Sequence, residues 1–141
     1  MAEANVETLR HGYEAMNRRD LSEVIALIDD DIVWNPGELS PDGQPDSRGR
    51  ESFVAFLHSW IEAFDEFRVE PYEVIEDGPF LIALVRQSGR GRASGAPIQI
   101  EIAHVWTIDD GRAVRLDSYR TEEAALQAVR EKRSSDAAPG A

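Results

Sequence analysis

The sequence predicts an α+β protein in which helices come first and a largely antiparallel sheet follows. Apolar residues recur at helical spacing in three stretches before residue 65. Beyond this point apolar residues alternate with polar ones or form short continuous runs, as they do in strands. Turn sequences such as Asp109-Asp110-Gly111 separate these runs. Helices followed by a meander of strands are typical of the α+β class.

The three helical stretches differ in how they are delimited. Residues 6–18 are expected to form the first helix, with Asn5 as its N-cap. Asp20 is expected to cap a second, short helix that begins at Leu21. Residues 51–64 carry an aromatic-rich stripe on one face, which we interpret as core or as the wall of a ligand site. The stripe consists of Phe53, Phe56, Leu57, Trp60, Ile61 and Phe64.

Five short segments have the pattern of strands. They are residues 32–34, 67–74, 80–85, 98–108 and 113–119. Pro71 shifts the apolar phase of its segment, which indicates an edge strand with a bulge. The continuous apolar run at 80–85 indicates a central strand that is covered on both faces.

The last helix is expected over residues 122–132, with Thr121 as its N-cap. Residues 133–141 are small and polar, and we expect them to be a disordered tail. Residues 1–132 are therefore predicted to form one domain, which the length of 141 residues also favours. Residues 35–49 are rich in proline and glycine and are expected to form a long loop, either a lid or a surface excursion.

Composition excludes several classes of function. The formal net charge of −12 argues against binding to nucleic acid or an anionic membrane, since phosphate neutralisation needs a basic face. The chain has no cysteine, which excludes disulfides, thiolate zinc sites and cysteine nucleophiles. No signal peptide and no membrane-spanning run is found, so we expect a cytoplasmic protein. The three histidines lie far apart, and no phosphate-binding glycine pattern occurs, so no metal or cofactor is expected.

Three segments resemble a known family. Residues 13–21 (YEAMNRRDL) and 27–34 (LIDDDIVW) are similar to the opening of SnoaL-like proteins in the nuclear transport factor 2-like superfamily, and residues 104–112 (HVWTIDDGR) to their closing part. The resemblance implies a cone-shaped fold, in which a curved, mostly antiparallel sheet wraps on three helices around an apolar pocket. It also implies a choice among steroid isomerases, polyketide cyclases, epoxide hydrolases, dehydratases and members without catalysis, so the fold alone does not define the function.

The ketosteroid isomerase pattern is not matched. That chemistry needs a proton-shuttling carboxylate, with a tyrosine and a protonated acid as oxyanion donors. The resemblance places these groups at Pro36 beside Asn35, at Gly12 and at Ala103. Tyr13 comes one residue after the tyrosine position, a rotation of about 100° around a helix. We therefore expect no isomerase activity of this kind.

The epoxide hydrolase and cyclase patterns are matched only in part. The last-strand acid of the hydrolases falls on Ser118, while the neighbouring Asp117 points to the other face unless a bulge turns it inward. Arg86 matches the arginine of the hydrolases' Arg-x-Asp pair, but Ser88 stands in place of its acid. Polyketide cyclases pair a last-strand acid with a histidine, for which His104 is the candidate.

The same resemblance assigns the two faces of the strand at residues 98–108. It places Ala103 and Glu101 toward the pocket, where a carboxylate could act as a general acid or base, or could pair with Arg86. His104 would then lie on the outer face with several isoleucines, either as a core or interface residue or as a catalytic base. So large an apolar face predicts a homodimer that covers it.

The leading hypothesis is a SnoaL-like domain that binds a small apolar molecule in the pocket of the cone. The candidate ligand-binding residues are Tyr13, Trp34, Trp60, Arg86, Val105, Ser118 and Arg120. The alternative is an acid–base enzyme of the cyclase, dehydratase or hydrolase type, with His104 or Glu101 acting together with Asp117. A third possibility is a module that dimerises through its sheet and binds no ligand.

Overall fold

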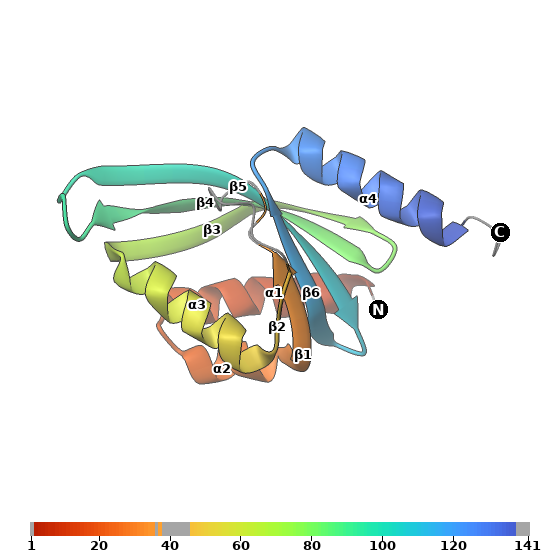
Figure 1. Cartoon of the computed structure of the whole chain (residues 1–141), viewed down its shortest axis with the longest axis horizontal. Coiled ribbons are helices and arrows are strands. Elements are labelled where there is room, and N and C mark those ends of the chain that lie inside the picture. Colours follow the sequence, from red (N-terminus) through yellow and green to blue (C-terminus); the bar gives the residue numbers. More distant parts are fainter. Residues whose placement is uncertain (1, 36, 38–45, 138–141) are drawn as a thin grey trace.

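The computed structural model describes residues 2–35, 37 and 46–137 (Figure 1). The helices are α1 (Ala2–Asn17), α2 (Leu21–Ala26), α3 (Arg50–Glu62) and α4 (Glu122–Ala137), and the strands are β1 (Ile28–Asn35), β2 (Ser47–Arg48), β3 (Phe64–Asp77), β4 (Phe80–Gly91), β5 (Pro97–Asp109) and β6 (Arg112–Tyr119). This order confirms the predicted one and adds the short strand β2. Within the described ranges no helix combines the length and the apolar composition that crossing a membrane requires.

The strands form one open, mixed sheet in the order β2-β1-β6-β5-β4-β3. Only β1 and β6 run parallel, and the other described neighbours are antiparallel. The expected edge strand is confirmed, because β3 lies at the end of the sheet and its pairing with β4 shifts between Pro71 and Glu73. The α+β class and the cone arrangement are likewise confirmed, with α1, α2 and α3 on one side of the sheet and α4 on the other (Figure 1).

Local signals account for most helix and turn boundaries. The Asp20 carboxylate accepts a hydrogen bond from the backbone N–H of Glu23, and the Thr121 hydroxyl accepts one from Ala124, so both predicted N-caps are confirmed. Asn5 is not a cap, because α1 begins at Ala2. The β5–β6 hairpin closes through Asp110 and Gly111, both at positive φ, which suits the right-handed twist of the two strands.

The sheet separates two apolar cores. Its inner face packs against α1, α2 and α3, and its outer face packs against α4. In β4 the alternate residues Leu81, Ala83 and Val85 face inward, whereas the other parity faces α4. The continuous apolar run is therefore a central strand that is covered on both faces, as predicted.

Helix α4 corrects the predicted tail. It continues to Ala137, so residues 133–137 are helical, and residues 138–141 lie outside the described residues. Ala125 and Val129 of α4 are fully buried on the outer face of the sheet. Arg133 forms an ion pair of 2.8 Å with Asp77 at the end of β3. This contact ties the distal part of the helix to the sheet.

The predicted loop at 35–49 is shorter in the structure. Asn35 ends β1, and Ser47 and Arg48 form β2, which pairs with Trp34 and Val33. The sequence left open whether this loop is a lid or a surface excursion. That question concerns residues 36 and 38–45, which lie outside the described residues.

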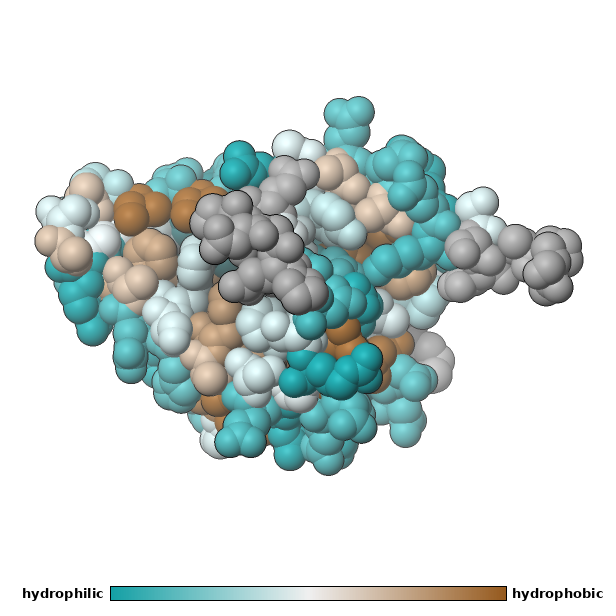
Figure 2. Space-filling view, in the orientation of Figure 1, coloured by the Kyte–Doolittle hydropathy of each residue, from teal (hydrophilic) through white to brown (hydrophobic). Residues whose placement is uncertain are grey.

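The predicted faces of β5 are wrong by one residue. Ile102, His104 and Trp106 face inward, whereas Ala103 and Val105 face α4. Because side chains alternate along a strand, an offset of one residue exchanges the two faces. The apolar surface that suggested a homodimer is thus internal, and the homodimer stays a prediction without this support. The face of the molecule shown in Figure 2 is mostly polar, with apolar residues in separate small areas, as expected for a charge of −12.

Candidate functional site

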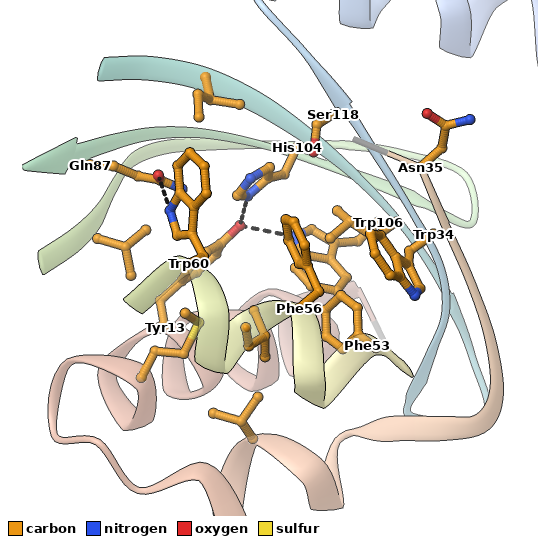
Figure 3. A pocket seen from close by; sticks show the side chains of 16 residues that line it. Tyr13, Trp34, Asn35, Phe53, Phe56, Trp60, Gln87, His104, Trp106 and Ser118 are labelled. Atoms are coloured by element: carbon orange, nitrogen blue, oxygen red, sulfur yellow. Dashed lines mark hydrogen bonds between the residues drawn. The ribbon is translucent and has the colours of Figure 1, made fainter. Parts of the chain in front are cut away.

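A cavity of about 290 Å³ lies between the inner face of the sheet and helices α1 to α3 (Figure 3). Most of its wall is aromatic or aliphatic. The lining residues are Tyr13, Met16, Val24, Trp34, Asn35, Phe53, Phe56, Leu57, Trp60, Val69, Gln87, Ile102, His104, Trp106, Leu116 and Ser118. The volume is close to the lower end of the range of about 300–1,000 Å³ that is typical of small-molecule sites.

Helix α3 supplies much of the aromatic wall. Phe53 and Leu57 are buried, while Phe56 and Trp60 are only partly buried, and all four line the cavity. The helical stripe therefore serves both as core and as ligand wall, the two interpretations that the sequence left open. Trp34 of β1 stacks at a tilt on Phe56, with ring centroids 4.6 Å apart.

Three side chains form a hydrogen-bonded chain in the cavity wall (Figure 3). The indole N–H of Trp106 donates to the Tyr13 hydroxyl at 2.9 Å, and this hydroxyl lies 2.8 Å from Nδ1 of His104. The rings of Tyr13 and His104 are nearly parallel, at 7°. All three side chains are buried.

The donors and acceptors of this chain determine where the protons lie. An indole N–H can only donate, so the Tyr13 oxygen accepts from Trp106. This oxygen has a second lone pair, so the direction of its bond to His104 depends on the histidine tautomer. We assign the proton of this bond to Tyr13, because no other acceptor for its hydroxyl is found among the described residues. The neutral imidazole then carries its proton on Nε2. Burial lowers the pKa of His104 to about 4, which keeps the ring neutral at neutral pH. Burial also raises the pKa of Tyr13, an effect that the hydrogen bond from Trp106 partly offsets.

The remaining polar groups of the cavity are neutral. Gln87 Oε1 accepts a hydrogen bond of 2.9 Å from the Trp60 indole, which orients the amide with its NH₂ group as the free end. Ser118 lies opposite His104 in the β5–β6 register. Asn35 uses both ends of its amide, since it donates to Asp46 and accepts from the backbone of Gly37. No carboxylate or cation lines the described part of the cavity.

Five predicted site residues lie outside the cavity: Asp117, which is described below, and four others. Glu101 is exposed and forms an ion pair of 3.1 Å with Arg86. Of the two interpretations of Glu101, acid–base catalyst or partner of Arg86, the structure shows the second. The Arg86 guanidinium also lies 5.4 Å from the centre of the Tyr72 ring. Val105 packs in the outer core, and Arg120 is exposed. The placements of Glu101 and Val105 follow from the one-residue offset on β5, and Arg86 lies opposite Glu101 in the β4–β5 register. Arg120 lies beyond the end of β6, where the alternation of the strand no longer applies.

Asp117 is buried on the outer face of the sheet, beneath α4. It accepts hydrogen bonds from Arg115 at 2.8 and 3.0 Å and from Lys132 of α4 at 2.8 Å. Arg115 also pairs with Asp46 at 3.1 Å. The β5–β6 pairing does contain an irregularity, between Thr107 and Ile108, but it leaves Asp117 facing outward. Neither carboxylate of the acid–base hypothesis therefore reaches the cavity.

The sequence identified part of the site. Tyr13, Trp34, Trp60, Ser118 and His104 line the cavity. Other lining residues were not predicted, and Gln87 is one of them. The sequence did contain a signal for Gln87, because it is a polar residue just beyond the continuous apolar run of β4 and alternates with the inward-facing residues of that strand. The contact between Tyr13 and His104 could not be predicted from neighbouring residues, because the two positions are 91 residues apart in the sequence.

The cone and its internal cavity define a protein of the nuclear transport factor 2-like type. Residues 9–116 match the SnoaL-like domain, and the chain belongs to this family. No curated protein matches the chain.

Solved structures with the same fold have varied descriptions. A nuclear transport factor 2-like protein of unknown function from Burkholderia pseudomallei K96243 is 29% identical, with a TM-score of 0.72 over 88% of this chain and 95% of that chain. TerC, co-crystallised with polyporic acid, is 21% identical, with a TM-score of 0.71 over 88% and 96%. An epoxide hydrolase from Mycobacterium tuberculosis that resembles limonene epoxide hydrolase is 17% identical, with a TM-score of 0.68 over 89% of each chain. The last two likenesses show the fold alone.

Proposed function

We propose that the protein binds a small, uncharged and largely apolar molecule in the cavity, and that His104 donates a hydrogen bond to an acceptor on this molecule. The observation that carries the proposal is the chain from Trp106 through Tyr13 to His104, which leaves an N–H on Nε2. Within the described residues the structure shows no other hydrogen bond of this ring. A bound molecule can supply the missing acceptor.

The polar groups of the cavity favour a particular ligand chemistry. His104 Nε2 and the Gln87 amide nitrogen are both donors, and the Ser118 hydroxyl can donate or accept. Carbonyl or ether oxygens suit this set. A carboxylate or an ammonium group does not, because the cavity has no opposite charge to offset the loss of its hydration.

The acid–base alternative retains His104 but not its carboxylate partners. Nδ1 is occupied by the Tyr13 proton, so the ring is placed to donate to a carbonyl oxygen and not to remove a proton. Catalysis by the described lining would therefore depend on hydrogen-bond donation alone, which makes binding the better-supported function.

Matched probe molecules test the binding proposal. Acetophenone carries a carbonyl acceptor, and ethylbenzene has a similar shape without one. We expect His104→Phe to weaken acetophenone binding about five- to tenfold, as loss of one neutral hydrogen bond predicts, and to leave ethylbenzene within about twofold. Kd values can be measured by titration calorimetry, or by the fluorescence of the three tryptophans, which all line the cavity.

The exposed His58 on α3 gives a matched control, since His58→Phe makes the same replacement away from the cavity. If His104→Phe weakens the binding of both probes by the same factor, the proposed hydrogen bond from His104 to the ligand is contradicted. If neither probe binds to the wild-type protein at millimolar concentration, the proposed function is contradicted.

A further inference from the structure

A second, smaller hollow lies beside the cavity. We call it the side pocket: it has a volume of about 50 Å³ and shares Tyr13, Met16, Val24 and Trp106 with the cavity. The rest of its wall comes from α1, the end of α2, the start of β1 and the β5–β6 turn, and Thr8 is the one polar side chain in that part. Because four residues line both hollows, they form the partition between them.

Three of the four partition residues are held in place. The Tyr13 hydroxyl and the Trp106 indole are fixed by their hydrogen bonds, and Val24 is a buried β-branched residue on a helix with one preferred rotamer. Met16 is only partly buried, and its side chain has three rotatable bonds and no strong hydrogen-bonding group. Met16 is thus the movable member of the partition.

Gly12 of α1 lines the side pocket next to Leu27. It lies within the helix, where glycine is less favourable than any other residue except proline. A Cβ at this position would lie 3.3 Å from Cδ1 of Leu27, which also lines the pocket, so Leu27 would have to shift. A methyl group at residue 12 would therefore press on Leu27 and change the shape of the pocket at this wall.

We propose that the side pocket is a second subsite of the cavity, which takes a short alkyl branch of the bound molecule when Met16 rotates aside. This inference rests on the proposed function and adds to it the chemical class of one part of the ligand. The occupant is a hydrocarbon group, because the wall of the side pocket is almost entirely apolar and offers few partners to a polar group. The donors of the cavity then hold the polar end of the same molecule.

Alkyl phenyl ketones test the subsite. Butyrophenone has two more methylenes than acetophenone, and each methylene transferred from water into an apolar site increases affinity about fourfold. In the wild-type protein we expect butyrophenone to bind roughly tenfold more tightly than acetophenone. In Gly12→Ala we expect this ratio to fall to about two or less, because the added methyl group and the Leu27 side chain that it displaces narrow the subsite.

Two further variants complete the comparison. Leu27→Phe places a larger side chain in the pocket wall and should reduce the ratio in the same way. Glu14→Ala changes an exposed position on the same helix and should keep the wild-type ratio. An unchanged ratio in both Gly12→Ala and Leu27→Phe would overturn the subsite and leave the proposed function standing.

Xenon separates the two proposals. We expect xenon to shift the methyl NMR signals of Leu27 in the wild-type protein and to have little effect in Gly12→Ala, whether or not a ketone binds. No xenon-dependent shift at Leu27 in the wild-type protein would overturn the side pocket. Failure of acetophenone and ethylbenzene to bind, with xenon shifts present, would instead overturn the proposed function.

Discussion

The free energy of unfolding should increase by about 3 kcal/mol between pH 4 and pH 6.5 through His104 alone. The buried ring has its pKa lowered from 6.5 to about 4 in the folded protein, because burial disfavours the imidazolium. Between these two values the unfolded chain binds a proton that the folded protein does not. Stability therefore falls as the pH drops through this window, and the loss is complete below about pH 4, where both states are protonated.

Urea unfolding at several pH values measures this effect. Other acids and histidines also titrate in the window, so the informative quantity is the difference between the wild-type protein and His104→Phe. We expect the variant to have the shallower pH dependence. Parallel pH profiles for the two proteins would contradict the assignment, as would an NMR titration that places the pKa of His104 near 6.5.

Replacing Asp117 by asparagine should lower the free energy of unfolding by about 2–4 kcal/mol. The carboxylate is buried and accepts hydrogen bonds from Arg115 and Lys132. Without this charge, Lys132 loses its ion pair with Asp117, Arg115 retains only the pair with Asp46, and α4 loses one of its attachments to the sheet. Both cations are about one-third exposed, at 32%, so water offsets part of the loss.

Glu101→Gln is the matched control for this prediction. It makes the same acid-to-amide change on the same face of the sheet, in an exposed pair with Arg86. Pairs of this kind contribute about 0–1 kcal/mol. Urea denaturation should therefore show a clearly larger decrease in the free energy of unfolding for Asp117→Asn than for Glu101→Gln. Equal decreases would contradict the structural role of Asp117. Acetophenone binding should be retained in Asp117→Asn, because this residue lies outside the cavity.

The fold was predictable because its signals are local. Helical periodicity, the caps at Asp20 and Thr121 and the turn at Asp110 each depend on residues close together in the chain. The class and the order of elements follow from such signals. The end of α4 was missed because residues 133–137 are polar, and the ion pair of Arg133 with Asp77 depends on the tertiary structure.

The faces of β5 could not be assigned from the pattern. Both parities around His104 are apolar, since Ile102 and Trp106 belong to the inner face and Ala103 and Val105 to the outer face. A strand covered on both sides has no polar face to indicate its orientation. In the folded protein the inward face includes the contact between Tyr13 and His104, which are 91 positions apart. The same contact creates the donor on which the proposed function depends.

The position of α4 in the chain also has a consequence for biosynthesis. This helix follows every strand that it covers, so a nascent polypeptide emerging from the ribosome presents the outer face before its cover has been made. During that interval Ile82, Leu84 and Val105, which α4 later shields, would face water and could adhere to neighbouring chains. The strong negative charge of the polypeptide opposes such encounters between newly made copies.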